Sequence, residues 1–296
     1  MIQQVLFDEI HQNIEVKPFK TQLLKWVGNK QKFSNEIVSS FPMKFNRYFE
    51  PFLGSGAVLS TLSPKNALAS DAFSPLIDIF LNLKNNPEEL KEWYRSRWEV
   101  AHGENKKEGY EKIKASYNKN PNGADFLYLS RSCYGGVIRF RKSDGYMSTP
   151  CGAHEPITPE SFNHRVDLWG ERVIHTEFRS CGYQDAMREA KAGDLVYCDP
   201  PYSHSQAILY GGHNFELEEL LKEIEKCKSR GVFVALSIDG TKKSGKLHCN
   251  LPIPDNLFEE EIFVNVGPSM LKRFQMEGKT LENEIVSDRL LLTYTL

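Results

Sequence analysis

The sequence predicts an α/β fold, in which a doubly wound sheet is interrupted by an inserted region of helices and a β-hairpin. Short apolar runs, such as "LVYC" at 195–198 and "GVFVALSI" at 231–238, are typical of buried strands, and amphipathic segments lie between them. Residues 86–180 differ, because their helical segments are highly charged and lead into "GGVIRFRKSDGYMSTPCG" at 135–152. The alternation about residues 143–145 in that last segment predicts a hairpin.

The N-terminal part of the sheet can be assigned element by element. An amphipathic helix is predicted to begin near Lys32 and to stop by Pro42. Residues 46–62 then predict a strand, a tight glycine-rich turn and a helix. A second strand follows at about 66–70, and apolar residues at helical spacing predict another helix before residue 85.

The α/β alternation resumes after Gly182. The elements predicted there are a strand at 195–198, a helix at about 215–229, and strands at 231–238, 260–266 and 289–295. The sheet-forming domain is therefore expected to be discontinuous. The expected boundaries are residues 20–85 and 180–296 for the sheet domain, 86–179 for the insertion and 1–19 for an N-terminal leader.

Composition limits the class of protein. With 296 residues, 40% of them hydrophobic, the chain can bury a sizeable core as one large domain with an insertion or as two domains. The six cysteines include no C-x-x-C pair, so reduced thiols are expected rather than a metal site or a disulfide framework. The first twenty residues are too charged for a signal core, and no segment is apolar over a membrane-spanning length. We therefore expect a soluble cytoplasmic protein that uses no metal and no membrane.

Charge is distributed unevenly along the chain. The formal net charge of −2 does not indicate nucleic acid binding. Between Lys106 and Lys142, however, nine Lys or Arg residues stand against three Asp or Glu residues. A basic patch of this kind can neutralise phosphates. The alternative for its first half is a solvated helix face, because acids are interleaved there at helical spacing.

Asp199 directly follows the strand predicted at 195–198, and Pro200, Pro201 and Tyr202 come next. Two prolines supply no ladder donors and restrict φ, so they end the strand. Ligands of open α/β sheets bind at the carboxyl ends of strands, which makes a carboxylate on this rigid turn a candidate for chemistry. For the Asp-Pro pair alone, the alternative is an acidic turn that merely ends a strand.

The segment "EPFLGSG" indicates a nucleoside site. It places Glu50 at the end of a predicted strand, and Gly54 and Gly56 in the turn to a helix, where the backbone can approach a ligand. A dinucleotide fingerprint would require a third glycine where this chain has Leu59, so pyrophosphate binding is disfavoured. Asp71 ends the next strand, where a carboxylate commonly accepts hydrogen bonds from ribose hydroxyls. A nucleoside without pyrophosphate fits both observations.

Upstream, "KWVGNK" places Trp26, Gly28 and Lys30 within one turn. An indole ring and an ammonium group beside a glycine can pack against a nucleoside and pair with a carboxylate. Taken singly, Trp26 is equally suited to the apolar core.

Five motifs occur in a fixed order along the chain. They are K-W-x-G-x-K at 25–30, E-P-F-x-G-x-G at 50–56, an acid at 71, F-L-Y-L-S-R at 126–131 with a following Y-G-G-x-x-R, and D-P-P-Y at 199–202. Together they resemble the Dam-type family of DNA adenine N6-methyltransferases, the alpha group of the D12 class. The resemblance runs from about residue 22 to residue 238 and is weaker in the C-terminal strands.

The resemblance implies a Rossmann-like methyltransferase sheet that uses S-adenosylmethionine as methyl donor. It makes residues 20–85 and 180–296 the catalytic domain and 86–179 a DNA target-recognition domain. The cofactor-binding positions carried over by the resemblance are Trp26, Gly28, Lys30, Phe52, Gly54, Gly56, Asp71 and Asp199.

For catalysis, the resemblance places Asp199, Pro200 and Tyr202 around the target adenine, and Phe215 in the base pocket. The N6 amino group is a poor nucleophile because its lone pair is delocalised into the ring. If Asp199 and the Pro200 carbonyl accept its two hydrogens, the lone pair is directed at the methyl group and the developing positive charge is stabilised. The adenine must leave the duplex to reach such a site.

For sequence recognition, the resemblance points to the insertion. Tyr134 occupies a position expected to wedge into the base stack, and Arg139 one expected to contact a guanine edge. Arg141 and Lys142 are candidate base or phosphate contacts, with simple surface charge as the alternative. Gly135 follows Tyr134 where many relatives carry asparagine, which argues against a GATC target.

The expected partner is double-stranded DNA, together with a cognate restriction endonuclease encoded separately. An RNA adenine N6-methyltransferase is one alternative, and a non-catalytic DNA-binding module on the same fold is another. A protein-glutamine methyltransferase is disfavoured, because such enzymes usually carry asparagine at the position of Asp199.

Overall fold

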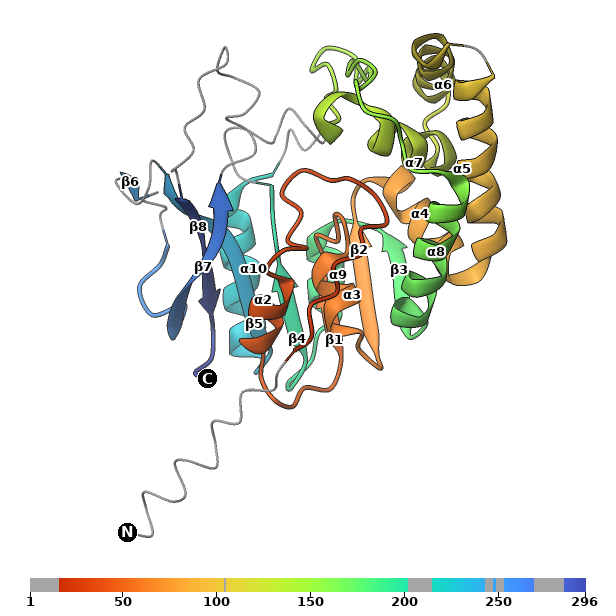
Figure 1. Cartoon of the computed structure of the whole chain (residues 1–296). Helices are drawn as coiled ribbons and strands as arrows, with labels where there is room; N and C mark the ends of the chain where they lie inside the picture. The colour runs from red at the N-terminus through yellow and green to blue at the C-terminus, as the bar shows by residue number, and fades with distance from the viewer. Residues whose placement is uncertain (1–15, 104, 202–214, 243–246, 249–252, 269–284) are drawn as a thin grey trace.

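The computed structural model describes residues 16–103, 105–201, 215–242, 247–248, 253–268 and 285–296 (Figure 1). A central sheet has the strand order β3-β2-β1-β4-β5-β8-β7, and β6 pairs with β5 at its side. The strands are β1 Tyr48–Glu50, β2 Ala67–Asp71, β3 Thr176–Ser180, β4 Leu195–Cys198, β5 Phe233–Lys242, β6 Leu247–His248, β7 Glu260–Pro268 and β8 Ile285–Leu292.

The strand order creates a switch point between β1 and β4. Strands β1 to β5 are paired in parallel, whereas β8 is antiparallel to both β5 and β7. From β1 the chain proceeds to β2 and β3 on one side, and it returns to β4 and β5 on the other. Open sheets bind ligands at such a point, outside the carboxyl ends of the strands. Glu50 ends β1 and Asp199 directly follows β4, so both lie there.

Side chains alternate between the two faces of the sheet, and helices cover each face. In β4, Leu195 and Tyr197 belong to one apolar cluster, whereas Val196 and Cys198 belong to another. The first cluster includes residues of α2 (Ser34–Ser39), α3 (Ala57–Leu62) and α4 (Ser74–Asn85), and the second includes residues of α9 (Tyr183–Glu189) and α10 (Leu217–Ser229). Figure 1 shows the sheet between these helices. The predicted Rossmann-like, doubly wound α/β class is confirmed.

Four further helices lie between β2 and β3 in the sequence: α5 (Pro87–His102), α6 (Lys106–Lys119), α7 (Gly123–Ser132) and α8 (Pro159–Val173). Figure 1 shows them gathered at one side of the molecule. Tyr94 of α5 stacks on Phe162 of α8 with ring centroids 4.2 Å apart, and Trp169 of α8 lies 6.1 Å from Phe80 of α4. These helices therefore share an apolar core with the first face of the sheet, and a separate recognition domain at 86–179 stays a prediction.

The edge strand β3 is missing from the sequence prediction. It pairs in parallel with β2 and lies in the part of the chain assigned to the insertion. Phe178 is the one apolar side chain in "TEFRS", and it points inward between the charged Glu177 and Arg179. Such a short edge strand has too little apolar periodicity to be recognised.

The hairpin predicted at 135–152 is present as an irregular segment rather than as two regular strands. We call residues 133–152 the hairpin segment. A short 3₁₀ turn, η1 (Tyr134–Gly136), stands near its start, and Gly135 and Gly136 have positive φ there, which interrupts an extended ladder. Isolated antiparallel bridges join its two arms, Cys133 with Cys151 and Phe140 with Met147.

Candidate active site

A cavity of about 1180 Å³ opens at the carboxyl ends of β1, β2 and β4. Its wall combines the turns that follow these strands with the tip of the hairpin segment. The residues predicted from sequence that line it are Trp26, Gly28, Lys30, Phe52, Gly54, Asp71, Lys142, Asp199, Pro200 and Phe215. Segments far apart in the chain thus meet at the switch point.

Lys30 is the centre of a buried ionic cluster. Its side chain is 4% exposed, and its Nζ lies 2.8 Å from Asp199 Oδ1 and 3.4 Å from Asp288 Oδ2. The same Nζ donates to the carbonyl of Gly28 at 3.3 Å. Burial alone would lower the pKa of Lys30, but the two carboxylates outweigh burial and raise this pKa above its usual value. The ammonium group therefore stays charged.

Glu50 lies close to this cluster, at the end of β1, and is 2% exposed. Burial raises the pKa of its carboxyl to about 8, and the charge of Asp199 adds to the shift. A hydrogen bond that the Tyr48 hydroxyl donates to Glu50 at 2.6 Å opposes it. Glu50 is therefore mainly protonated at neutral pH and adds little negative charge beside Asp199.

Asp71 is held by backbone amides at the end of β2. Its Oδ2 accepts a hydrogen bond from Gly54 N at 3.1 Å, and its Oδ1 accepts one from Phe73 N at 3.0 Å. Burial raises the pKa of Asp71, whereas these amide donors act in the opposite direction. The two bonds fix the carboxylate against the glycine-rich turn after β1.

The glycines of that turn are required by packing as well as by φ. Gly54 has φ of 48°, and a Cβ added there would lie 2.9 Å from Nε1 of Trp26. Gly56 has φ of 66°, and a Cβ added there would lie 3.1 Å from the Phe80 ring. Gly56 itself does not appear among the residues that line the cavity. Trp26 thus closes on the turn, and its ring also contacts Phe73, with centroids 6.2 Å apart.

Three aromatic rings form another part of the wall. Phe52 stacks on Tyr183 with ring centroids 5.0 Å apart, and its edge-on partner Phe215 lies at 5.9 Å. Tyr183 and Phe215 are 6.1 Å apart. All three residues line the cavity, so this trio supplies a continuous apolar surface.

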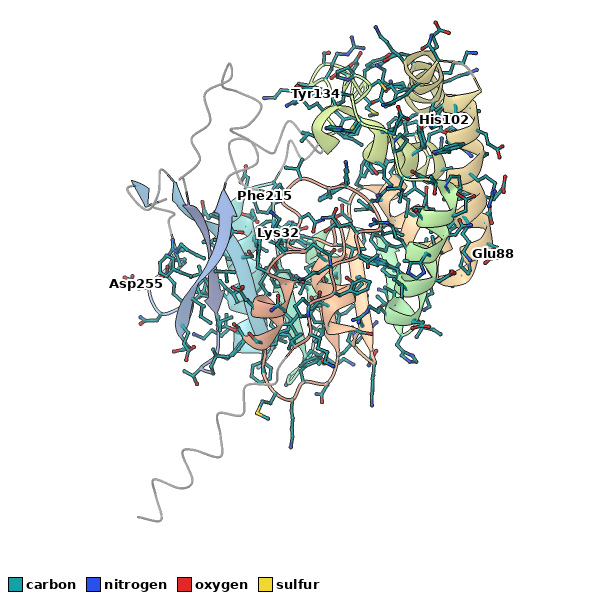
Figure 2. All side chains as sticks on the ribbon, in the orientation of Figure 1. Lys32, Glu88, His102, Tyr134, Phe215 and Asp255 are labelled. Atoms are coloured by element: carbon teal, nitrogen blue, oxygen red, sulfur yellow. The ribbon has the colours of Figure 1, made fainter. Side chains whose placement is uncertain are left out.

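The hairpin segment presents the residues predicted to contact DNA. Tyr134 is 48% exposed and lies in η1. In Figure 2 it is separated from Phe215, which lies near the top of the sheet. Arg139 is also exposed. Arg141 forms an ion pair with Asp144 at 2.8 Å, and its guanidinium lies 4.2 Å from the ring centroid of Tyr146.

A comparison with known families shows to which family the chain belongs. A model described as D12 class N6 adenine-specific DNA methyltransferase matches residues 26–260. The chain belongs to this family. It is an adenine-specific DNA methyltransferase, an enzyme that requires a methyl donor and acts on DNA.

Individual relatives of this methyltransferase cover most of the chain. The type II methyltransferase M1.LlaDCHI of Lactococcus lactis subsp. cremoris is 28% identical over 253 residues, which is 79% of this chain and 85% of the relative. A DNA adenine methylase of Vibrio cholerae serotype O1 is 27% identical over 242 residues, 76% of this chain and 83% of the relative. The type II methyltransferase M.MjaIII of Methanocaldococcus jannaschii is 29% identical over 251 residues, 76% of this chain and 84% of the relative.

The predicted site residues of the methyltransferase fall into three groups. Those that line the cavity come from the glycine-rich turn, the lysine turn, the end of β2, the D-P-P-Y motif, the residues just before α10 and the hairpin tip. Gly56 and three residues of the hairpin segment, Tyr134, Arg139 and Arg141, do not appear among the lining residues. Tyr202 lies outside the described residues, so the structure gives no placement for it.

Sequence reasoning missed three residues of the site: Glu50 as a protonated acid, Tyr183 and Asp288. Glu50 carried a signal, because it ends a predicted strand directly before the glycine-rich turn. Tyr183 follows the unpredicted strand β3 and begins the unpredicted helix α9, so no motif marked it. Asp288 lies in a strand whose sequence resembles any amphipathic strand.

Two absences apply to the described part of the chain. Within it, no group of three or more His, Cys, Asp or Glu side chains is placed to hold a metal ion. Among the helices in the described ranges, none has both the length and the apolar character needed to cross a membrane.

Proposed function

We propose that this methyltransferase moves a methyl group from S-adenosylmethionine to N6 of an adenine that is flipped out of double-stranded DNA into the cavity. The observation that carries the proposal is the position of Asp199. Its carboxylate follows β4 at the switch point, pairs with the buried Lys30 at 2.8 Å and lines the cavity together with Pro200.

The donor set of the cavity fits S-adenosylmethionine. Each oxygen of Asp71 accepts one backbone N–H and has capacity for a further hydrogen bond from a ribose hydroxyl. Trp26 and Phe52 both line the cavity and supply apolar faces for the adenosine part. Lys30 lines the same cavity and holds Asp199 in place with its buried ammonium group. When bound, this cofactor supplies an electrophilic methyl group on a positively charged sulfur.

Asp199 and Pro200 would act on the adenine amino group. An ionised carboxylate only accepts hydrogen bonds, and the Pro200 carbonyl belongs to a turn that has few donors of its own. Accepting both amino hydrogens favours a tetrahedral nitrogen whose lone pair is free to attack, and it stabilises the positive charge that develops there. The methyl group is then transferred in line, without a covalent enzyme intermediate. Holding both substrates in position contributes several kcal/mol more, on the order of 7–11 in favourable systems.

The size of the cavity supports an extruded base. Its volume of about 1180 Å³ exceeds the range of about 300–1,000 Å³ that is typical of a site for one small ligand. A flipped adenine next to the cofactor would use this space, with Phe215 as one wall. By resemblance, Tyr202 would provide the stacking ring. Extrusion costs about a few kcal/mol, which contacts with the flipped base offset.

The hairpin segment would contact the DNA. The exposed ring of Tyr134 suits a wedge beside the vacated base, and the exposed Arg139 suits a bidentate contact with a guanine edge. Lys142 lines the mouth of the cavity, where it can meet a phosphate next to the target. Residues 86–179 would then form the target-recognition domain, with Arg141 as an additional contact.

A restriction-modification context is the proposed biological setting. Two of the relatives above are named type II methyltransferases. The proposed partner is accordingly a restriction endonuclease encoded separately, whose target this enzyme would protect.

The decisive experiment measures transfer of labelled methyl from S-adenosylmethionine to unmethylated duplex DNA, with structured RNA in parallel and with digestion of the products to nucleosides. We expect N6-methyladenine in DNA. Asp199→Asn keeps the shape of the side chain but removes the ionised acceptor, and we expect it to lower kcat by about 10²–10³-fold.

The binding of duplex DNA by Asp199→Asn, measured by fluorescence anisotropy, serves as its control and should match the wild type. Label found only in RNA would show that RNA, not DNA, is the substrate. Wild-type activity in Asp199→Asn would show that the Asp199 carboxylate is not needed for methyl transfer.

A further inference from the structure

We propose that Asp288 is a positioning residue for the transfer reaction: through Lys30 it fixes Asp199, so the C-terminal strand β8 belongs to the catalytic apparatus. The inference rests on the proposed function, because it concerns the same acceptor carboxylate. Asp288 lies outside the five motifs of the chain.

The contacts of Lys30 carry the inference. An ammonium group has three N–H donors. Within the described ranges, three acceptors lie near Nζ of Lys30: Asp199 Oδ1 at 2.8 Å, Asp288 Oδ2 at 3.4 Å and the Gly28 carbonyl at 3.3 Å. These acceptors come from the turn that follows β4, from β8 and from the turn that precedes α2. Three fixed acceptors allow one orientation of the ammonium group, and that group in turn fixes Asp199.

Burying these charged side chains costs free energy of desolvation. Lys30 is 4% exposed and Asp288 is 6% exposed. Lys30 and Asp199 alone would form a pair with no net charge. A second buried carboxylate, that of Asp288, carries a desolvation cost that a favourable partner must offset. The backbone of Asp288 is fixed as well, because β8 is hydrogen-bonded to β5 on one side and to β7 on the other. The acid is therefore a rigid support for Lys30.

A second carboxylate also changes the electrostatics at Asp199. If Lys30 interacted with Asp199 alone, its full charge would draw electron density from the carboxylate that must accept the amino hydrogens. With Asp288 sharing the ammonium group, the three side chains carry a net charge of −1, since one lysine faces two carboxylates. Asp199 then remains a stronger acceptor, and a net negative charge suits a reaction in which positive charge develops on nitrogen.

The test is Asp288→Asn, which keeps the shape of the side chain and removes its charge. We expect kcat for methyl transfer to fall by about 10- to 100-fold, as for other small displacements of a reacting group, while KM for DNA stays unchanged. Glu261→Gln is the matched control: it removes one negative charge from the neighbouring strand β7, where Glu261 pairs with Arg289 of β8 near the surface. This control should keep the wild-type kcat, because exposed pairs contribute little.

A double-mutant cycle with Lys30→Met separates positioning from general stability. In the Lys30→Met background, Asp288→Asn should cause no further loss of kcat, because the lysine through which it acts on Asp199 is already removed. Losses that multiply independently would overturn the proposal, and so would a wild-type kcat in Asp288→Asn. If Asp288→Asn does not fold, Asp288→Glu decides: it keeps the charge and should recover most of the activity, and an inactive but folded Glu variant would contradict the role. A wild-type enzyme that methylates no DNA would instead overturn the proposed function before any variant is made.

Discussion

The carboxyl edge of the sheet and the hairpin segment 133–152 both contribute to one cavity, but they hold their polar side chains by different means. At the sheet edge, Lys30, Glu50 and Asp288 are each less than 7% exposed, and their partners come from distant parts of the chain. On the hairpin segment, Tyr134 is 48% exposed, and Arg141 pairs with Asp144 three residues away.

The difference corresponds to the two tasks that we propose for these regions. Electrostatic stabilisation of a reacting group is strongest where water is excluded and the dipoles are fixed, as they are around Lys30. Contact with a polyanion requires side chains that remain accessible and that exchange their local partners for phosphates or base edges. Substitutions should therefore have large effects on stability and cofactor binding at the sheet edge, and smaller effects on the hairpin segment.

The largest expected contrast is between two glycines, one from each region. Gly54 and Gly145 have φ of 48° and 67°, so alanine at either position costs about 1–3 kcal/mol in backbone strain. At Gly54 the new Cβ would also meet Trp26 Nε1 at 2.9 Å, whereas nothing lies within 4 Å at Gly145. Gly54→Ala should therefore lose about 1–3 kcal/mol more than Gly145→Ala in denaturant unfolding.

Cofactor affinity sharpens this comparison. Because Trp26 must move to admit the Gly54→Ala side chain, we expect weaker binding of S-adenosylmethionine in calorimetry. Gly145→Ala should bind the cofactor as the wild type does. Equal losses of stability and affinity in the two variants would mean that the two regions are constrained alike.

The next effect is the pH dependence that Glu50 gives to the sheet edge. Burial holds the pKa of its carboxyl at about 8, against 4.5 in the unfolded chain. Between these values the folded state binds a proton that the unfolded state has lost, so stability falls as pH rises through this window, by up to about 1.4 kcal/mol per pH unit. The stability of Glu50→Gln should fall less steeply over this range, as measured by denaturant unfolding at intervals from pH 5 to 8.5.

A second variant at this site should extend the pH range over which stability falls. Tyr48 donates a hydrogen bond to Glu50 and thereby lowers the pKa of the carboxyl. Tyr48→Phe removes this donor, so the loss of stability should extend to higher pH than in the wild type. Parallel pH profiles for the wild type and both variants would show that Glu50 is ionised throughout and would contradict a buried neutral acid.

The same contrast explains which parts of the molecule could be predicted from sequence. Strand β4 and the first four residues of β5 are apolar runs next to turn residues, so both strands are easily recognised. The sequence also places Lys30 and Asp199 on turns next to a sheet, which is enough to expect them in one site. Asp288 was not predictable in this way, because a single acid in an antiparallel strand normally faces solvent, and only the tertiary arrangement of β8 brings it to Lys30.

The hairpin segment was predicted in outline only. The alternation about residues 143–145 indicates its turn, and the bridge between Phe140 and Met147 confirms that the two arms are paired. The alternation does not show that Gly135 and Gly136 have positive φ and that the ladder is therefore broken. It also does not show that a helix residue, Asn118 of α6, completes the pairing with its side chain.

That side chain gives the smallest effect expected here, on the stability of the hairpin segment. Asn118 Oδ1 accepts from Met147 N at 2.6 Å, and Asn118 Nδ2 donates to Met147 O at 3.1 Å, as a neighbouring strand would. Asn118→Ala should lower stability by about 1–2 kcal/mol, since two neutral hydrogen bonds are lost. Cofactor affinity should change less than in Gly54→Ala, because both bonds go to the hairpin segment, although Asn118 also lines the cavity. Discrimination between target sequences, measured as the ratio of kcat/KM on cognate and altered duplexes, should decrease.

Asn122→Ala is the matched control for this variant. Asn122 caps α7 by accepting from Asp125 N at 2.8 Å, so its loss costs a comparable 0.5–2 kcal/mol, on the order of one helix cap, without touching the hairpin segment. If discrimination falls only in Asn118→Ala, the hairpin segment depends on its support from α6 to select a sequence. If both variants lose discrimination equally, discrimination between target sequences depends on overall stability. The hairpin segment would then depend on the core as much as the sheet edge does.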